Sequence, residues 1–410
     1  MRRCRGPHIH GRRTVAETFD TRLSRRVSSC AARERPVNAG LAGGPASGGA
    51  TTLGGFTGGQ LRRLCAVAGL SEDDADGYAE VVAGSLGTVA GRSLDLPPPS
   101  QSFLSDDHTP VEFSLSCRPG SAPAVRVLVE PGCGAGSLAR NGRAGLAAVR
   151  AMTQRWGFAT DSLDALVELF LPARPRGVFA LWYALELRPG GVPGLKVYLN
   201  PAANGEERSA ATVREALRRL GHERAPDVLP EADGYPFLAL DLGDWDAPRV
   251  KVYLRHDALS AQAAGGLSRM PAGPDPGSVE GFFRAAAGAD VPLLTRRPGL
   301  TCHSFTETGA ARPSGFTLHV PVRDYAEHDG EALRRAAKIM RDLGIGTAVL
   351  NEALRALTSR RLDEGVGLIA YLALAHQEGS PPRVTAYLSS EAYAVRPPNR
   401  APARSAQPVY

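Results

Sequence analysis

The sequence lacks the features that mark membrane proteins, secreted proteins and zinc proteins. None of its apolar runs approaches the roughly 18 residues that a membrane-spanning helix needs. Its arginine-rich N-terminus has no apolar segment of the kind that a signal peptide requires. The six cysteines form no CxxC pairs, which argues against a disulfide framework and against a zinc site. We therefore expect a soluble, cytoplasmic protein with buried thiols, no metal site and no membrane partner.

The sequence also has little net charge for its length. The formal charge is +6 over 410 residues, and much of the excess lies near the N-terminus, which does not predict a nucleic-acid partner. Residues 1–52 are rich in Arg and Gly without an apolar period, so we predict a disordered tail there and a second one over 397–410. The N-terminal composition is also compatible with a mitochondrial transit peptide. Residues 53–396 remain as a single domain.

An acidic cluster near the N-terminus falls short of a known metal motif. The motif DDxxD holds magnesium and a diphosphate in many isoprenoid enzymes, and here Asp73, Asp74 and Asp76 are followed by Gly77 where the last acid would stand. We expect these acids at the start of a helix over 73–85, where they stabilise the helix dipole.

A strictly alternating segment, Arg249–His256, predicts a β-strand with one polar and one apolar face. Arg249, Lys251 and Tyr253 occupy alternate positions (one parity) and so point to one side of the strand, and Val or Leu fills the positions between them. The pattern recurs at intervals of 55 to 70 residues in four other segments: Val125–Val129, Leu195–Leu199, Phe316–Val320 and Arg383–Leu388. Each of the five follows an apolar run: Val111–Cys117, Val178–Leu187, Pro236–Leu242, Thr301–Thr306 and Gly367–Ala375. The repeat therefore predicts five hairpins, or ten strands.

Segments with a helical period lie between the hairpins. The clearest are Ala147–Trp156, Ser162–Phe170, Ala210–Leu220, Ser278–Ala286, Glu331–Leu343 and Ala348–Leu357. Consecutive hairpins form an antiparallel sheet, and ten strands tend to curl or close. We therefore predict an α+β fold, in which a ten-stranded antiparallel β-barrel is surrounded by a ring of α-helices that covers its apolar face. The polar face then lines the lumen.

Basic side chains in such a lumen imply an anionic ligand, because buried cations are costly unless they are paired. The polar faces offer few carboxylates apart from Glu112 and Glu186, so we expect the cations to be unpaired and to bind a diphosphate. Tyrosines beside them would present π-faces to a carbocation. The combination indicates ionisation of an allylic diphosphate.

Two alternatives remain open from the residues. The glycine-rich stretch Val127–Gly136 resembles the cofactor loop of S-adenosylmethionine methyltransferases, but such a loop needs a helix directly after it. Here Asn141-Gly142 is expected to break that helix, and paired strands do not suit a parallel sheet. The second alternative is a barrel that binds a small molecule without catalysis.

The Lys-x-Tyr at 196–198, the Arg-x-Lys-x-Tyr at 249–253 and the strand entry at Pro110–Glu112 resemble aromatic prenyltransferases of the dimethylallyltryptophan synthase type. The resemblance covers roughly residues 55–395. It implies the ABBA or PT barrel and transfer of a dimethylallyl group from dimethylallyl diphosphate to an indole ring, in secondary metabolism such as alkaloid biosynthesis. It also implies no cofactor, no need for magnesium in catalysis, and a monomer or homodimer.

The resemblance also assigns roles to individual residues. The diphosphate would be bound by Arg126, Lys196, Arg249 and Lys251. The aromatic shield around the cation would consist of Tyr198, Tyr253, Tyr371 and Tyr387, with Thr317 and His319 lining the lumen. Glu112 would accept a hydrogen bond from the indole N–H, and Arg188 would stand where many members have a catalytic lysine. Asn200 replaces a tyrosine that contacts the amino-acid carboxylate in fungal members, so a dipeptide or another indole is as plausible an acceptor as tryptophan.

Overall fold

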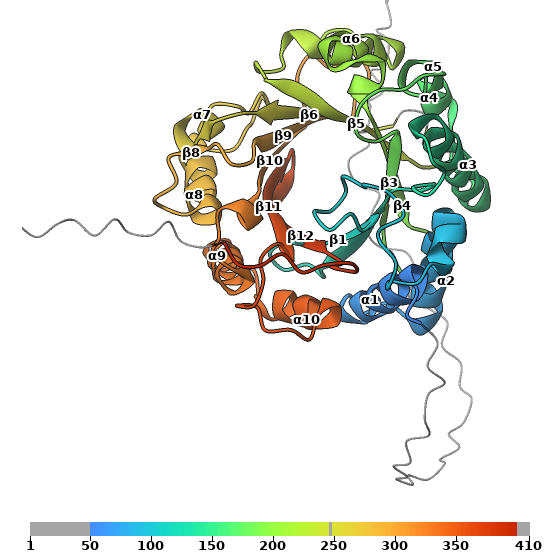
Figure 1. Ribbon diagram of the computed structural model, residues 1–410. Helices are drawn as coiled ribbons and strands as arrows, with labels where there is room; N and C mark the ends of the chain where they lie inside the picture. The colour runs from blue at the N-terminus through green and yellow to red at the C-terminus, as the bar shows by residue number, and fades with distance from the viewer. Residues whose placement is uncertain (1–49, 246–247, 400–410) are drawn as a thin grey trace, which may run out of the picture. The chain divides into compact units, whose positions relative to one another are not determined.

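The predicted hairpins close into one barrel, in which helices form the outer layer (Figure 1). The computed structural model describes residues 50–245 and 248–399, so the two predicted tails lie almost wholly outside the described residues. Antiparallel pairing runs in the order β1-β12-β11-β10-β9-β6-β5-β4-β3-β2, and β2 returns to β1. The strands of the barrel are β1 (Val111–Cys117), β2 (Ala124–Val129), β3 (Leu181–Glu186), β4 (Gly194–Leu199), β5 (Gly234–Leu242), β6 (Val250–His256), β9 (Gly299–Phe305), β10 (Gly315–Val320), β11 (Ile369–Gln377) and β12 (Ser380–Ser389). The predicted fold class is confirmed.

Closure depends on pairing between the first and last strands of the barrel. In β1, Glu112 lies opposite Ser389 of β12 on one side and opposite Leu128 of β2 on the other. Every strand of the barrel therefore has two neighbours, so the barrel has no open edge.

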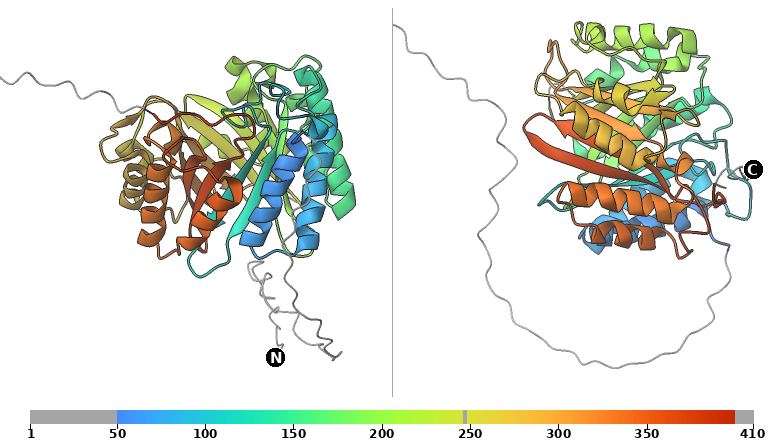
Figure 2. Two further views of the ribbon diagram at one scale, coloured as in Figure 1. Left: turned by 60° about the horizontal axis from the view of Figure 1, so that its bottom comes forward. Right: turned by 90° about the vertical axis from the view of Figure 1, so that its left-hand side faces the viewer.

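The alternation seen in the sequence separates the two faces of the barrel. Outward-facing residues of β6, such as Val250 and Val252, are fully buried under the helices. Figure 2 shows helices running alongside the strands on the outer face. They are α1 (Leu53–Val67), α2 (Glu72–Leu86), α3 (Leu138–Trp156), α4 (Asp161–Asp164), α5 (Val167–Phe170), α6 (Ser209–Arg219), α7 (Ala261–Gly265), α8 (Pro276–Ala287), α9 (Asp329–Asp342) and α10 (Ala348–Leu357). A short ribbon that the sequence did not predict pairs β7 (Leu259–Ser260) with β8 (Leu293–Leu294).

Asp73 and Asp74 of the acidic cluster lie in the first turn of α2, as predicted. Ser71 caps this helix by accepting a hydrogen bond from the backbone N–H of Asp74 at 3.1 Å. The carboxylates therefore face the positive end of the helix dipole.

The glycine-rich stretch has a packing role. Contrary to the expectation that Asn141-Gly142 would break the following helix, α3 begins at Leu138, where Ser137 caps it. Gly132 has a φ of 68°, and a Cβ there would lie 2.6 Å from the Cβ of Ala144, so this glycine lets the loop approach α3. The strand before the loop is antiparallel to both of its neighbours, unlike the parallel sheet of the methyltransferases.

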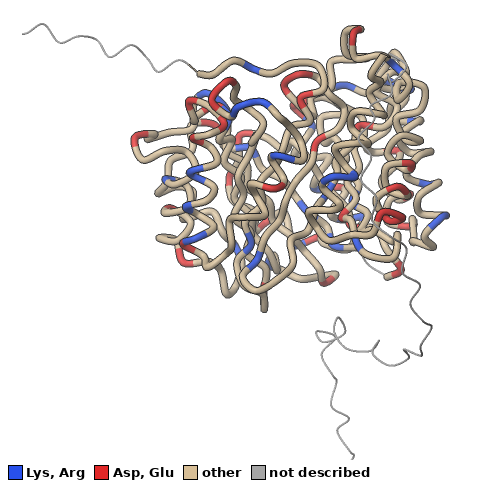
Figure 3. Tube along the Cα trace, turned by 90° about the horizontal axis from the view of Figure 1, so that it is seen from below, with Lys and Arg blue, Asp and Glu red and all other residues tan. Residues whose placement is uncertain are grey.

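Other expectations about the chain can be compared with the described residues. Among these, no helix has the length and apolar character needed to cross a membrane. Cys65, Cys117, Cys133 and Cys302 are buried free thiols, while Cys4 and Cys30 lie outside the described part. Figure 3 shows basic and acidic residues interspersed along the described chain.

Candidate active site

A cavity of about 140 Å³ occupies the lumen of the barrel. Eleven of the twelve residues predicted for the site line this cavity: Glu112, Arg126, Arg188, Lys196, Tyr198, Arg249, Lys251, Tyr253, Thr317, His319 and Tyr387. Tyr371, the twelfth, lies beside the cavity, with its ring centre 6.4 Å from that of Tyr387. The parity predicted from the sequence is therefore correct, and the polar face of each hairpin points inward.

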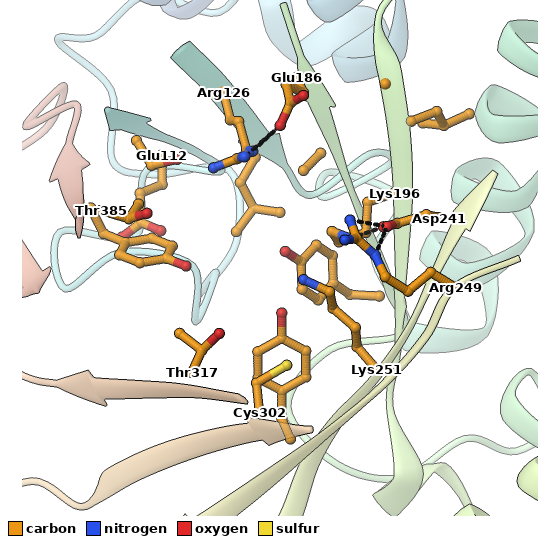
Figure 4. Close-up of a pocket in the computed structure, with 18 of the residues that line it drawn as sticks. Glu112, Arg126, Glu186, Lys196, Asp241, Arg249, Lys251, Cys302, Thr317 and Thr385 are labelled. Atoms are coloured by element: carbon orange, nitrogen blue, oxygen red, sulfur yellow. Dashed lines mark hydrogen bonds and ion pairs between the residues drawn. The ribbon is translucent and has the colours of Figure 1, made fainter. Parts of the chain in front are cut away.

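The expectation that the basic residues are unpaired is wrong for three of the four. The Nε of Arg126 donates to Glu186 at 2.9 Å. Asp241, on β5, forms ion pairs with both Lys196 and Arg249, and the Nε of Arg249 donates to it at 2.5 Å (Figure 4). Sequence reasoning missed Asp241 because its strand was treated as an apolar run, although its parity points into the lumen. The β4–β5 register places it directly opposite Lys196.

Two basic side chains in the cavity have no acidic partner among the described residues. Lys251 is 8% exposed, and burial followed by the charge of Arg249 lowers its pKa to about 7. Arg383, which the sequence analysis did not select, lines the same cavity from β12. Burial and then the charge of Arg126 lower the pKa of Arg383 to about 10, so it stays protonated near neutral pH. Arg383, Thr385 and Tyr387 are alternate residues of β12 and share one face, so strand alternation could have identified Arg383.

We call Arg126, Lys196, Arg249, Lys251 and Arg383 the cationic cluster. Figure 4 shows Arg126 on one side of the open space and Lys196, Arg249 and Lys251 on the other. Its five basic groups outnumber the two carboxylates that pair with them, Glu186 and Asp241. Because an excess of buried positive charge is unfavourable without a counter-charge, the cluster is suited to a multiply charged anion.

Arg188 lies at the rim, where its Nη2 contacts Glu186 at 3.1 Å. Its side chain is 49% exposed. A guanidinium stays protonated in proteins, so Arg188 can orient or attract a ligand but is not suited to accept a proton.

An arc of aromatic rings lies beside the cationic cluster. Ring centres are 5.9 Å apart for Tyr198 and Tyr253, 5.9 Å for Tyr253 and His319, and 5.7 Å for His319 and Tyr387. Burial raises the pKa of Tyr387 to about 12 and lowers that of His319 to about 3, so both groups are neutral. Neutral electron-rich rings around a cavity can stabilise a carbocation through their π-faces.

Glu112 faces the cavity from β1 and is 6% exposed. Burial raises its pKa to about 8, and this shift is opposed by the positive charge of Arg323. Its carboxyl group has no ion-pair partner in the described part of the chain. A group of this kind can accept a hydrogen bond from a ligand that is itself becoming positively charged.

A group of apolar residues lies next to Glu112 and was not predicted. Leu104, Phe179 and Trp182 form a buried cluster with Leu128, Tyr198 and Phe237, and Leu128 is the strand neighbour of Glu112. The rings of Phe179 and Trp182 stack with centres 4.3 Å apart. Trp182 on β3 and Phe237 on β5 could have been found from strand alternation, whereas Leu104 and Phe179 lie outside the strands. Of this cluster, Leu128 and Tyr198 line the cavity, where they offer apolar surface to a flat aromatic ligand.

Asn200 has a structural role in this fold. Its side chain donates to the carbonyl of Phe179 at 2.7 Å and accepts from the N–H of Ala202 at 2.9 Å. These contacts cap the 3-10 turn η2 (Pro201–Asn204) next to the barrel.

Within residues 50–245 and 248–399, His, Cys, Asp and Glu side chains form no group of three that could hold a metal ion.

A ten-stranded antiparallel barrel that holds a cationic cluster beside an arc of neutral aromatic rings defines an aromatic prenyltransferase of the PT-barrel type. The family model for tryptophan dimethylallyltransferase matches residues 57–266. A 5-dimethylallyltryptophan synthase from Streptomyces coelicolor, solved with DMASPP and Trp, is 66% identical, with 87% of this chain and 100% of that chain covered and a TM-score of 0.83.

Two further structures agree with this match. Prenyltransferase PriB, solved with L-tryptophan and dimethylallyl thiolodiphosphate, is 62% identical over 85% of this chain and 99% of its own, with a TM-score of 0.84. A 6-dimethylallyltryptophan synthase from Micromonospora olivasterospora is 37% identical over 85% of this chain and 99% of its own, with a TM-score of 0.77. The chain belongs to the tryptophan dimethylallyltransferase family, so it is a prenyltransferase.

Proposed function

We propose that the protein transfers the dimethylallyl group of dimethylallyl diphosphate to a ring carbon of tryptophan or a tryptophan-derived indole. The observation that supports this most is the juxtaposition, in one cavity, of the aromatic arc with two basic groups that have no acidic partner in residues 50–245 and 248–399, Lys251 and Arg383. Relatives more than 60% identical over nearly their full length were solved with tryptophan and a donor analogue, which favours tryptophan itself as acceptor.

The reaction is dissociative in this proposal. The bond between C1 of the donor and its oxygen breaks, and both electrons leave with the diphosphate. A ring carbon of the indole then forms a bond to the allyl cation, and the proton on that carbon is lost to restore aromaticity. The products are the prenylated acceptor, diphosphate and a proton.

The cationic cluster supplies the electrostatic stabilisation of the leaving group. Its charges are fixed before the reaction by Glu186 and Asp241, so little reorganisation is needed as negative charge develops on the diphosphate. Lys251 and Arg383 offer the donors that are still available to the ligand. The aromatic arc shields the allyl cation from water, which would otherwise capture it.

Glu112 acts on the acceptor. A carboxylate that accepts a hydrogen bond from the indole N–H favours attack by the ring, because positive charge spreads to that nitrogen as the new bond forms. The raised pKa of about 8 means that binding of the acceptor must also promote ionisation of Glu112 near neutral pH. Leu128 and Tyr198, the members of the apolar cluster that line the cavity, would hold the indole plane against this group.

Metal independence also belongs to the proposal. The cationic cluster occupies the role that magnesium has in enzymes with DDxxD motifs, so activity is expected to persist in EDTA. A cytoplasmic monomer or homodimer remains the prediction for location and assembly.

The test is incubation of the purified protein with dimethylallyl diphosphate and a panel of indoles, with and without EDTA, followed by mass spectrometry. The expected product is L-tryptophan with one added prenyl unit in both conditions, and NMR of that product identifies the ring carbon. No prenylation of any indole would overturn the proposed function. Loss of activity that only magnesium restores would overturn metal independence alone.

A further inference from the structure

A buried arginine, Arg323, lies beside the ring of Tyr371 and outside the cationic cluster. It belongs to the 3-10 turn η5 (Val322–Asp324), which begins two residues after β10 ends. Its side chain is 6% exposed, and its guanidinium carbon lies 5.1 Å from the ring centre of Tyr371. The ring of Tyr371 lies 6.4 Å from that of Tyr387, which lines the cavity together with Glu112, so Arg323 approaches the lumen from the side of Tyr371. Its positive charge also opposes the effect of burial on the pKa of Glu112.

The hydrogen bonding of Arg323 is incomplete. One terminal nitrogen, Nη2, lies 3.3 Å from an oxygen of Asp106. Its Nε lies 3.8 Å from Asp324, beyond hydrogen-bond distance, and has no hydrogen-bond partner among the described residues. A guanidinium carries five N–H donors, and leaving such a donor buried without a partner is costly.

The two nearby carboxylates are already engaged by other arginines. Asp324 accepts from the Nε of Arg297 at 2.5 Å and from Arg396 at 3.0 Å. Asp106 accepts from Arg297 at 3.1 Å and lies 3.6 Å from Arg396. Three arginines thus share two carboxylates, and Arg323, the most buried of the three, has the poorest contacts. The cluster therefore has capacity for one more carboxylate.

The chemistry of the acceptor supplies such a group. An amino acid with an indole side chain carries its α-carboxylate on a short arm from the same five-membered ring that bears the N–H. An arginine near Glu112 is placed to meet this arm when Glu112 meets the N–H. We propose that Arg323 binds the acceptor α-carboxylate, in place of its long contact with Asp106, and so selects indole amino acids over indoles without a carboxylate. This inference rests on the proposed function.

Asp106 is the contact that a ligand would displace. It lies in the segment between the 3-10 turn η1 (Gly87–Gly91) and β1, and its side chain is 34% exposed, compared with 10% for Asp324. A bidentate arginine–carboxylate pair is stronger than the single contact of 3.3 Å that it would replace. After the exchange, Asp106 would keep its contacts with Arg297 and Arg396.

The test compares three acceptors with wild type and Arg323→Gln. L-Tryptophan and indole-3-propionate carry the carboxylate, and tryptamine does not. In the variant, kcat/KM is expected to fall by about 10- to 100-fold for the two carboxylates, as for loss of a hydrogen bond to a charged group, and to change little for tryptamine. Arg323→Lys keeps the positive charge but cannot form a bidentate pair, so its loss of kcat/KM for the two carboxylates is expected to be smaller than that of Arg323→Gln.

Arg396→Gln is the matched control, because Arg396 contacts the same two carboxylates from a more exposed position. It is expected to lower the melting temperature without altering the preference among the three acceptors. Equal losses for all three acceptors in both Arg323 variants would mean that Arg323 only supports the fold. Unchanged preference in a well-folded Arg323→Gln protein would also overturn the inference.

A binding measurement separates this inference from the proposed function. Calorimetry with L-tryptophan, in the presence of the thiolodiphosphate donor analogue, needs no turnover. If the wild type prenylates none of the acceptors, the proposed function fails. The inference then stands only if L-tryptophan still binds at least about 10-fold more weakly to Arg323→Gln than to wild type.

Discussion

The end of the cavity that binds the prenyl donor (the donor end) and the end that binds the indole (the acceptor end) differ in how their charged groups are held. At the donor end, Glu186 and Asp241 fix three members of the cationic cluster, and Lys251 and Arg383 remain available. At the acceptor end, Glu112 forms no ion pair with the described residues, its neighbour on β2 is Leu128 of the apolar cluster, and the charges of Arg323 and Asp106 act on it from a distance. One end is thus organised before the ligand arrives, whereas the other depends on the ligand to set the ionisation of its central residue.

This difference matches the chemistry of each substrate. A diphosphate is fully charged in water and leaves with still more negative charge, so preorganised cations are useful throughout the reaction. An indole is neutral until it is attacked, so a permanent charge would be of little use before that step. A carboxyl group with a raised pKa can respond when the N–H becomes acidic.

The largest effect is expected for Glu112→Gln. Glutamine retains a hydrogen-bond acceptor but has no negative charge, and positioned acid–base groups contribute about 10²–10⁴-fold in rate. We expect kcat to fall within that range while the KM for the donor stays near the wild-type value. A kcat within about twofold of wild type, far below that range, would show that the acceptor end does not depend on this carboxylate.

The same substitution has an opposite effect on stability. Burial raises the pKa of Glu112 from 4.5 to about 8 in the folded protein, so the stabilisation from its bound proton is complete below pH 4.5 and is lost as the pH rises through 8. Glutamine does not ionise and has no such loss. Glu112→Gln is therefore expected to melt above wild type at pH 9, with the difference shrinking toward pH 5. Melting curves over this range check the sign.

Lys251→Ala is expected to act on the donor alone. It removes a cation that has no acidic partner, and loss of one preorganised group of this kind costs about 10²–10³ in rate. We expect a higher KM for dimethylallyl diphosphate and a slower ionisation step, with the affinity for tryptophan little changed. Lys338→Ala on α9, where the lysine is 63% exposed and paired with Asp342, is the control and should match wild type. Equal donor kinetics in the two variants would show that Lys251 does not bind diphosphate.

Asp241→Asn tests how the donor end is preorganised. Removing one partner of a buried ion pair destabilises a protein by up to about 3–5 kcal/mol, here because Lys196 and Arg249 would be left facing each other. Inorganic pyrophosphate supplies the missing negative charge, so it should raise the melting temperature of the variant more than that of wild type. A smaller rise in the variant would indicate that Asp241 assists anion binding by holding Lys196 and Arg249 in position.

The smallest expected effect is the uptake of a proton by Lys251 when diphosphate binds. Its pKa of about 7 reflects burial and then the charges of Arg249, Arg383 and Arg126, with Cys302 also nearby. Bound diphosphate should raise that pKa, so at pH 8 binding is expected to take up a fraction of a proton, and affinity should weaken as the pH rises above 7. Titration calorimetry in two buffers of different ionisation enthalpy measures this uptake, which should disappear in Lys251→Ala.

Much of the donor end could be predicted from the sequence. Lys196, Lys251 and Tyr253 belong to strands whose period of two is unbroken, so parity alone placed them in the lumen. The acceptor end was harder to predict from the sequence. Leu104, Phe179 and Arg323 lie in loops and turns beside the strands, where no periodic pattern indicates direction.

The sequence by itself determined the ten strands, their inward and outward faces and the ring of helices, because each follows from a local period repeated five times. Tertiary structure decided which charges meet. Asp241 neutralises Lys196 because the β4–β5 register sets them opposite each other, and Arg323 reaches the neighbourhood of Glu112 because closure joins β1 to β12. Ion pairing and pKa depend on distances across strands and on burial, neither of which a local pattern encodes.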